Sequence, residues 1–419
     1  MGKTITKKIF EKIAGREVDP GETVWMKPDL ALLIDIQWPV IYRLFKETGV
    51  GKVWDPDQWV VIIDHTVQAC AYPPSVGVLH NSLRKFVKEQ GIKWFYDIGN
   101  HGIAHQLMRE EGHVRPGILY TNDSPERGEE VMGCLYLGAG TRIFTVLATG
   151  MGYWTMPLDC KVKVSGSLQK GVMPRDIGDY ISGDVGPSGF RSMSVEVSGP
   201  TIDAMDLDER HALLNVLRGG AYCSIMNPDQ KVIDHITPIA KGPWEVIISD
   251  PDAEYEKNLS YDVSNLEPQI VSGPARAQGA AKPVSESEGI EINEACIGSC
   301  GSGMMPDLRA AVEILKGKKV HKDVRLFITP STQRIFMQAA REGLIETLLQ
   351  SGAIILTPGC GTCVGYVGQL DSGEVAITTH NSNHTGRMGA MDAKIYLGST
   401  YTVAASAVKG RITDPRNLL

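Results

Sequence analysis

Three cysteines set in glycine-rich turns are the residues whose type and spacing point most directly to chemistry. Cys300 ends the motif Ile297-Gly-Ser-Cys300, and Cys360 and Cys363 lie in Pro358-Gly-Cys-Gly-Thr-Cys363. Iron–sulfur clusters are held by cysteine thiolates, usually one per iron, so three thiolates on a four-iron cluster would leave one iron open. An open iron is a Lewis acid to which a substrate oxygen can bind. The three residues are therefore candidates for a cluster site with an open coordination position.

Two other kinds of site use the same residues. Adding Cys296 gives a C-x3-C pair followed by a C-x2-C pair, which zinc also uses. Cys360 and Cys363 alone have the spacing of a redox dithiol. The eight cysteines are spread over 419 residues, unlike those of a small disulfide-rich secreted domain. Reduced thiols and a metal site are favoured, and a cluster would leave Cys296 as a buried neighbour.

Asp64 and His65 place an acid beside an imidazole directly after the apolar run 59–63. That run predicts a strand, and α/β proteins place their ligand sites at the carboxyl ends of strands. A carboxylate can hold the imidazole protonated, which makes it a proton donor to a leaving hydroxyl. An ordinary surface ion pair is the competing interpretation.

Two further segments carry polar groups suited to binding. His101 and His105 are four residues apart and would share a face if a helix begins there. Metal binding is possible for them, but a hydrogen-bonding role that orders the loop is favoured. Asn381-Ser-Asn-His-Thr-Gly-Arg387 is a turn-rich loop ending in an arginine, whose guanidinium can bind a carboxylate through two parallel hydrogen bonds.

The elements that position these residues follow a strand, helix, strand rhythm. Residues 59–63, 82–90 and 93–96 show it first, and residues 323–328, 332–342 and 353–356 repeat it late in the chain. The rhythm predicts an α/β fold with parallel sheets. No internal repeat is evident in the sequence itself.

The region between these two α/β parts has a different texture. Residues 160–165 and 192–198 alternate apolar and polar side chains, and a polar stretch rich in Gly, Ala, Pro and Ser at 272–289 predicts a linker. Boundaries near 158 and 275 therefore predict three domains, at residues 1–158, 159–275 and 276–419, of which the last carries the cluster cysteines.

Composition and charge exclude several classes of protein. A chain of 419 residues is too long for one core, and 42 % hydrophobic with 22 % charged residues is typical of a globular protein. There is no apolar run near 20 residues and no signal-peptide core at the start, so we expect no membrane span and a cytoplasmic location. A net charge of −7 argues against nucleic-acid binding and leaves a small anionic substrate possible.

Taken together, the motifs along the whole chain resemble those of the aconitase superfamily, most closely the large subunits of 3-isopropylmalate dehydratase and homoaconitase. Besides those quoted above, the motifs that carry the resemblance are Lys52-Val-Trp-Asp-Pro56, Phe95-Tyr-Asp-Ile-Gly99, Val114-Arg-Pro-Gly117, Gly138-Ala-Gly-Thr141, Val146-Leu-Ala-Thr-Gly150, Ser194-Val-Glu-Val-Ser-Gly199, Gly386-Arg-Met-Gly389 and Val403-Ala-Ala-Ser-Ala407.

The resemblance implies three α/β domains around one 4Fe-4S cluster. The cluster would be bound by Cys300, Cys360 and Cys363, with its fourth iron open to the hydroxyl and a carboxylate of the substrate. The implied reaction is the stereospecific dehydration and rehydration of a hydroxy di- or tricarboxylate, without net redox change. A base removes a proton α to a carboxylate, and an acid assists departure of the hydroxide.

The resemblance also carries individual residues over to this chain. The catalytic candidates are Asp64, His65, His105, Asp123 and Glu196, the last matching the glutamate that faces the iron-bound water. The substrate-binding candidates are Asn381, Ser382, Asn383, His384 and Arg387. Because the chain ends near where large subunits of this family end, a separate small subunit is expected to carry the swivelling fourth domain with its serine base. This chain alone would then be inactive.

Several positions depart from the family pattern. Pro125 replaces a histidine of the family's DSHT segment and cannot titrate, and Ser382 replaces an arginine that grips a substrate carboxylate in relatives. Gly301 and Ser302 replace the usual threonine and asparagine, and His101 stands where relatives often have a small residue. An Arg-to-Ser change removes a contact of roughly 1.5 to 3 kcal/mol, and loss of a positioned acid or base slows a reaction about a hundredfold to ten-thousandfold.

Three interpretations follow. The favoured one is a hydro-lyase with an altered substrate, in which His384, His101 or Glu126 fills part of the vacated space. The second is an ordinary 3-isopropylmalate or homoaconitate enzyme that tolerates the changes. The third is a cluster-bearing sensor or binding subunit without catalysis. The retained cysteines, Asp64-His65 and Arg387 argue against the third.

Overall fold

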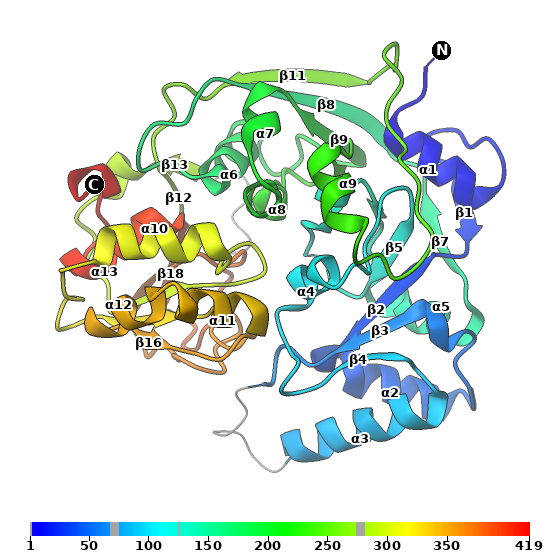
Figure 1. The fold of residues 1–419 in the computed structure, drawn as a ribbon, viewed down its shortest axis with the longest axis horizontal. Coiled ribbons are helices and arrows are strands. Elements are labelled where there is room, and N and C mark those ends of the chain that lie inside the picture. Colours follow the sequence, from blue (N-terminus) through cyan, green and yellow to red (C-terminus); the bar gives the residue numbers. More distant parts are fainter. Residues whose placement is uncertain (1, 68–74, 125, 274–280) are drawn as a thin grey trace. The chain divides into compact units, whose positions relative to one another are not determined.

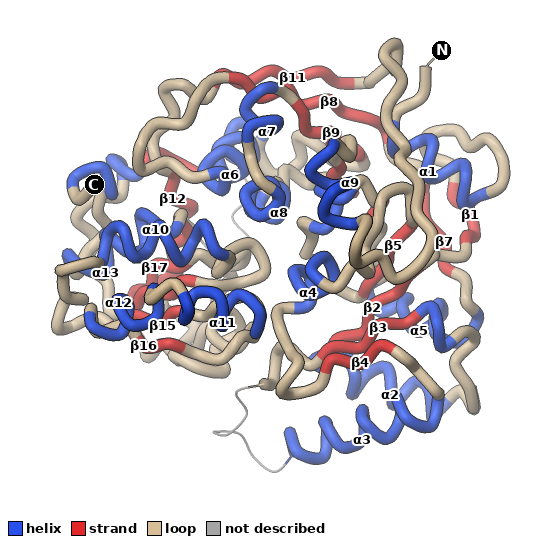
Figure 2. Tube along the Cα trace, viewed as in Figure 1, coloured by secondary structure: helices blue, strands red, loops and turns tan. Residues whose placement is uncertain are grey.

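The computed structural model describes residues 2–67, 75–124, 126–273 and 281–419, drawn in Figures 1 and 2. The chain forms two compact units, each built from more than one stretch of sequence. The first contains Met1–Lys163, Ser192–Ser198 and Tyr222–Leu259, and the second contains Val164–Arg191, Gly199–Ala221 and Ser260–Leu419. The three-domain division at residues 158 and 275 is not tested by this two-way division and stays a prediction.

The first unit contains most of the elements before residue 164. Its helices are α1 (Ile5–Ala14), α2 (Trp38–Glu47), α3 (Ser75–Gln90), α4 (Ala104–Glu110), α5 (Ile143–Thr149) and α9 (Gln230–Ile236). Its strands are β1 (Thr23–Met26), β2 (Leu30–Ile34), β3 (Trp59–Ile62), β4 (Trp94–Tyr96), β5 (Leu119–Asn122), β6 (Leu135–Tyr136), β7 (Gly152–Thr155), most of β8 (Leu158–Ser165), β9 (Met193–Ser198) and β10 (Cys223–Ile225).

The main sheet of the first unit has the strand order β4-β3-β2-β5-β6, and all its strand pairs are parallel. Strands β2 and β3 are buried along their whole length. Continuous apolar strands of this kind occur where both faces of a parallel sheet are covered. In Figure 1, α2 and α3 lie side by side below these strands.

A second sheet in this part of the chain has the order β10-β9-β8-β11, where β11 is Lys257–Asp262. Strand β8 alternates buried and more exposed positions, as the alternating sequence at 160–165 predicts. Strands β8, β9 and β10 run parallel. Strands β1 and β7 form a separate antiparallel pair.

The second unit contains the remaining elements. Its helices are α6 (Pro174–Val185), α7 (Pro200–Ala204), α8 (Leu207–Val216), α10 (Met305–Leu315), α11 (Gln333–Arg341), α12 (Leu344–Gln350) and α13 (Thr400–Lys409). Its strands are β12 (Gln269–Val271), β13 (Ala281–Pro283), β14 (Glu294–Ile297), β15 (Arg325–Ile328), β16 (Ile354–Ile355), β17 (Val375–Thr378) and β18 (Lys394–Gly398).

The sheet of the second unit has the order β13-β12-β18-β17-β14-β15-β16, and β18 to β16 form a parallel sheet. Its five parallel strands lie in the order β16-β15-β14-β17-β18, and those of the first unit lie in the order β4-β3-β2-β5-β6. In both sets of five, the first strand along the chain is central, the next two follow on one side, and the last two follow on the other. The two units therefore share a topology that no sequence repeat reveals. One face of this sheet packs on α10, α12 and α13, and Cys296 lies in the core on the other face.

The predicted α/β class is confirmed by these parallel sheets, and the strands and helices predicted at 59–96 and 323–356 are present with shifted ends. The predicted linker is wrong in part, because residues 281–283 form β13 and pair with β12. Residues 274–280 of that stretch lie outside the described residues. Among the described residues, no helix is long and apolar enough to span a membrane.

Candidate functional site

The carboxyl ends of the two parallel sheets carry the residues singled out from the sequence. In the first unit, β3 and β4 lie on one side of β2, and β5 and β6 lie on the other. The strand order therefore reverses at β2, because the chain adds strands first on one side of it and then on the other. Open α/β sheets bind ligands at such a topological switch point. Because Ile34 pairs with Ile62, Asp35 and Asp64 follow the two strands at the same edge.

Asp64 and His65 form the predicted pair in the turn after β3. The Nδ1 atom of His65 lies 2.5 Å from Asp64 Oδ1, and the other carboxylate oxygen of Asp64 accepts the N–H of Ala104 at 3.0 Å. Burial by itself would raise the pKa of Asp64, but the His65 charge and hydrogen bond hold that pKa below its usual value. Asp64 therefore orients the imidazole and also satisfies an N–H group at the start of α4.

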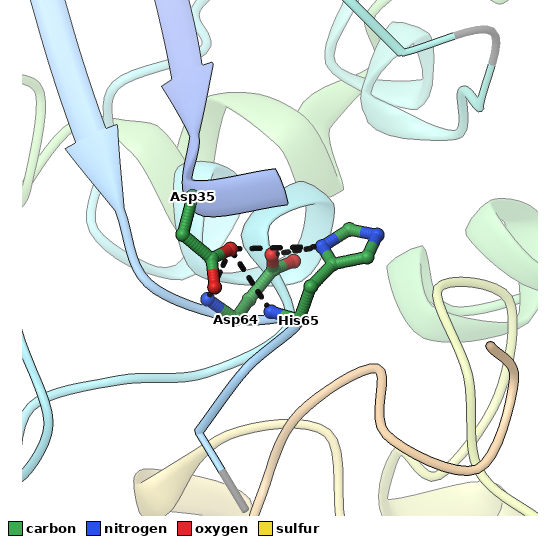
Figure 3. Close-up of side chains that lie close together, drawn as sticks. All are labelled: Asp35, Asp64 and His65. Carbon is green, nitrogen blue, oxygen red and sulfur yellow. Dashed lines mark hydrogen bonds and ion pairs between the residues drawn. The ribbon is translucent and has the colours of Figure 1, made fainter. Parts of the chain in front are cut away.

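Asp35 holds the turn that carries this pair, as Figure 3 shows. Its fully buried carboxylate accepts N–H groups from Asp64 at 3.2 Å, His65 at 3.1 Å and Thr66 at 2.8 Å, and the hydroxyl of Thr66 as well. Asp35, Asp64 and His65 are close enough to hold a metal ion. Because the oxygens of Asp35 are committed to the turn, the arrangement fits a structural support better than a metal site.

His101 and His105 do not share a helix face, because α4 begins only at Ala104. The Nδ1 atom of His101 accepts the N–H of Gly99 at 3.0 Å, and burial lowers the pKa of His101. His101 therefore has the loop-ordering role predicted for it. No cluster of metal-binding side chains among the described residues contains either histidine.

His105 instead pairs with Glu129, a residue that no motif marked. Its Nδ1 atom lies 2.7 Å from Glu129 Oε1, and the side chains of His105 and Glu129 are 6 % and 0 % exposed. Burial works to lower the pKa of His105, but the charge and hydrogen bond of Glu129 outweigh it and raise the pKa to about 9. The Glu129 contact therefore favours the protonated form of His105.

Asp123 lies directly after β5 and is nearly buried. Neither of its carboxylate oxygens makes a hydrogen bond to another described residue. Burial raises the pKa of Asp123 to about 7. Pro125, the residue that departs from the family pattern nearby, lies outside the described residues.

Glu196 lies on β9 in a separate hydrogen-bond network of the first unit. Its carboxylate accepts from Asn227 at 2.8 Å, Ser249 at 2.5 Å and Tyr255 at 2.8 Å. Lys161 Nζ lies 3.9 Å from the same carboxylate. The structure thus holds Glu196 in a saturated network, and its predicted catalytic role stays a prediction.

The second unit places Cys300 in the turn after β14, beside two asparagines. The side-chain amide of Asn381 donates to the sulfur of Cys300 at 2.9 Å and also bonds the side chain of Asn215. A Cβ atom added at Gly301 would clash with Asn215 Oδ1, so the small residue after Cys300 is what lets Asn215 approach. The backbone oxygen of Cys300 lies 2.7 Å from His211 Nε2.

Helix α8 supplies both His211 and Asn215. It begins with a reciprocal capping box, in which Asp206 accepts the N–H of Glu209 at 2.8 Å and Glu209 accepts the N–H of Asp206 at 2.9 Å. One turn separates His211 and Asn215, so they lie on the same face of the helix. Nothing in the sequence marked either residue.

Cys363 is bound by Arg387. The guanidinium donates to the backbone oxygen of Cys363 at 2.7 Å and to its sulfur at 3.2 Å. The pKa of the Cys363 thiol is held well below its usual value by hydrogen bonding to Cys360, with smaller effects from Arg387 and His380, against the opposing effect of burial. These contacts therefore favour the thiolate form of Cys363, which is the form that ligates metals.

The loop carrying Asn381 is fixed by a buried arginine. Arg175 on α6 donates to the backbone oxygens of Thr379 and His380 and lies 3.1 Å from Asp179 Oδ2. The hydroxyl of Thr379 in turn accepts the N–H of Gly298 at 2.9 Å. The turn after β14 and the turn after β17 are thereby tied together.

The other predicted substrate-binding residues lie farther along this loop. Ser382 Oγ lies 3.0 Å from His384 Nδ1, so His384 does adjoin the position where relatives have an arginine. Asn383 donates to the backbone oxygen of Ile395 at 3.3 Å and lines a cavity of about 430 Å³ with Tyr396. None of the three cysteines is among the described residues that line that cavity.

The described cysteine turns do not bring together the three ligand atoms that a single zinc ion would need. Three thiolates on one zinc, at a Zn–S distance of about 2.3 Å, would lie within about 4 Å of one another. Among the described residues, no three ligand atoms from the cysteine turns lie that close together. Cys296 is fully buried in a core cluster, with its sulfur 3.4 Å from Glu294 Oε1, as expected of a neighbour that is not a ligand.

The sequence is similar to known proteins along its whole length. The family description that matches the sequence is "Aconitase family (aconitate hydratase)", over residues 7–284 and 275–410. The 3-isopropylmalate dehydratase large subunit 1 of Methanopyrus kandleri is 37 % identical over 423 residues, with 100 % of both chains covered. The large subunit of the same enzyme from Desulfitobacterium hafniense is 38 % identical over 429 residues, again with 100 % of both covered. The holo-form aconitase X of Thermococcus kodakaraensis is more distant, with a TM-score of 0.49 and 11 % identity over 90 % of this chain and 89 % of that one.

Proposed function

This chain belongs to the aconitase family of hydro-lyases, and we propose that it is the large subunit of a dehydratase with altered specificity. Its substrate would be a small hydroxy carboxylic acid other than those of 3-isopropylmalate dehydratase and homoaconitase. The observation that carries the hydro-lyase part of the proposal is the set of side chains around the cysteines, whereas Ser382 and His384 carry the altered substrate. Asn381 and Arg387 donate hydrogen bonds to the sulfurs of Cys300 and Cys363.

We infer that Cys300, Cys360 and Cys363 hold one 4Fe-4S cluster. Hydrogen bonds to sulfur stabilise thiolates and tune bound clusters, which accounts for the positions of Asn381 and Arg387. When bound, the cluster would supply a Lewis-acidic iron for a substrate oxygen.

The chain's own residues supply proton transfer and anion binding. His65, oriented by Asp64, is suited to donate a proton to the leaving hydroxyl, because its partner stabilises the imidazolium form. His105, as a cation, is suited to bind a substrate carboxylate. Asp123, with a pKa of about 7 caused by burial, is suited to exchange a proton near neutral pH.

The altered substrate is supported by Ser382 and His384. Where relatives place an arginine, this chain has a hydroxyl 3.0 Å from an imidazole, which offers no fixed guanidinium to a carboxylate. A substrate with one fewer carboxylate or a different substituent there would suit the pair. An ordinary 3-isopropylmalate dehydratase is the second candidate, favoured by the full-length similarity.

The test uses the full chain with a family small subunit, reconstituted anaerobically with iron and sulfide. We expect turnover of a hydroxy acid in a panel that varies the number of carboxylates and the size of the substituent. Turnover of 3-isopropylmalate or homoaconitate at rates ordinary for this family would overturn the altered-substrate proposal. A reconstituted chain without iron–sulfur absorbance would overturn the cluster assignment.

The relatives are named as large subunits, and we propose a small-subunit partner for this chain as well. The chain alone is then expected to bind the cluster and to show no turnover. Full-rate turnover by the chain alone would contradict this. A cluster-bearing binding subunit without catalysis would keep the cluster in both preparations and show no turnover in either.

A further inference from the structure

We propose that Glu129 is the positioning residue that holds His105 as a cation, and that Asp123 is thereby left as an unpaired carboxyl available for proton transfer. The pairing stands on the geometry of the first unit alone. The roles of the His105 cation in substrate binding and of the Asp123 carboxyl in proton transfer rest on the proposed function.

Two elements fix the pair from opposite ends. His105 lies in the first turn of α4, and Glu129 begins the short 3-10 helix Glu129–Met132, which packs against α4. The 2.7 Å contact between His105 Nδ1 and Glu129 Oε1 lies in a water-poor environment, since both side chains are nearly or fully buried. Low dielectric strengthens a contact between opposite charges and keeps the ring in one orientation.

The largest charge effects on the ring favour the imidazolium form. Glu129 is the strongest of them, and Glu126 and Asp64 add to its effect. The adjacent Glu130 carries less charge at neutral pH than an ordinary glutamate, because burial and the Glu129 charge raise the pKa of Glu130 to about 7. Glu130 Oε2 is occupied by the N–H of Gly128, 2.6 Å away.

Asp123 is a buried carboxyl whose two oxygens accept no hydrogen bond from any other described residue. A carboxylate bonded to an imidazolium would have a lowered pKa, but burial raises the pKa of Asp123 to about 7 while the charges of His65 and His105 only partly oppose it. The nearby Asp64 charge works in the same direction as burial. Glu129 therefore pairs with His105, whereas Asp123, the carboxylate that the family motif marked, does not.

The consequence for the ring is a fixed proton arrangement. With Nδ1–H donated to Glu129, Nε2–H is the remaining donor of a permanently charged imidazolium. Such a group binds a carboxylate or an oxyanion and does not serve as a base at neutral pH. Glu129 acts through His105 and is not expected to contact the substrate.

The experiment follows the ring protons of His105 in the full chain with ¹⁵N-labelled histidine by NMR, with H105Q to assign the signal. We expect His105 to stay protonated at pH 7. E129Q should lower its titration midpoint by about two pH units, a hundredfold change in proton affinity. D123N should shift it by less than about half a unit, and E126Q, which removes a weaker charge effect, should shift it by less than E129Q does.

The opposite result, a large shift in D123N and little in E129Q, would overturn the pairing. A neutral His105 ring at pH 7 in the unaltered chain would do the same. If E129Q does not fold, E129D is used instead, because it keeps the negative charge. A protonated His105 at pH 7 in E129D, together with a small shift in D123N, would support the pairing. Because none of these measurements needs turnover, failure of the proposed function would leave them interpretable. In the two-chain enzyme, E129Q should raise KM for an anionic substrate more than it lowers kcat.

Discussion

The carboxylate of Asp35 accepts the backbone N–H of His65 at 3.1 Å, so the end of one strand fixes the turn that follows the next. Asp35 also bonds the amides of Asp64 and Thr66, which makes it the anchor of the whole turn. The orientation of the Asp64 and His65 side chains therefore depends on a residue that is not expected to touch the substrate.

Replacing Asp35 by asparagine tests this dependence. D35N puts an NH2 group where an oxygen accepts backbone N–H groups, so buried donors are left without partners, at a cost of about 1 to 3 kcal/mol in the free energy of unfolding. We expect a large fall in kcat with unchanged iron content. The exposed control D57N should change neither quantity, and wild-type kcat in D35N would contradict the anchoring role.

The cysteine assignment predicts a division between ligands and their neighbour. C300S, C360S and C363S should each lose most of the bound iron and sulfide, because each removes a thiolate ligand. C296S should keep it, since Cys296 lies in the core on the face of the sheet away from α10, α12 and α13. Full iron content in C300S, or loss of iron in C296S alone, would contradict the assignment.

Asp123 predicts a pH dependence of stability. Because its pKa is about 7 in the folded chain and ordinary in the unfolded chain, the folded state binds the extra proton between about pH 4 and pH 7. The contribution of Asp123 to stability is therefore lost as the pH rises through that window, by up to about 1.4 kcal/mol per pH unit.

D123N removes this pH dependence, because an asparagine side chain does not titrate. The free energy of unfolding of D123N, relative to that of the unaltered chain, should therefore rise between pH 5 and pH 8. Urea unfolding at both pH values measures the difference, and D57N serves again as the exposed control. A D123N effect that is the same at pH 5 and pH 8 would show that Asp123 is ionised throughout.

The fold class could be predicted because it depends on local patterns, and the cysteine turns stay a prediction that rests on the same kind of pattern. The apolar run before Asp64 predicts a buried parallel strand, and the cysteine turns carry glycines where the backbone bends. Asp35 also follows a buried strand, so the rule that marked Asp64 could have marked Asp35.

Other site residues left no local signal. In the sequence, Asn215 is an ordinary helix position and Glu129 resembles a surface glutamate. Only the tertiary contacts distinguish them, because Asn381 bonds Asn215 and α4 packs against the helix that Glu129 begins. Pairings of this kind are set by tertiary contacts between distant segments, which a single sequence does not show. For the same reason, the shared strand order of the two units became visible only in the structure.

Arg175 provides a test of how the loop before Asn381 is held. Its planar guanidinium bonds two successive backbone oxygens and Asp179, and a lysine ammonium cannot span that arrangement. Arg175 is 3 % exposed, so R175M leaves Asp179 as a buried charge without its partner and should cost about 3 to 5 kcal/mol in unfolding free energy.

R175K should lower the free energy of unfolding by less than R175M does, but it should still weaken the contacts that hold the loop. We therefore expect reconstituted R175K to lose iron to a chelator faster than the unaltered chain. R309K is the matched control, because Arg309 pairs with Glu342 on the surface, where such pairs contribute about 0 to 1 kcal/mol. If R175K loses iron at the same rate as R309K, then Asn381 is held at Cys300 without help from Arg175.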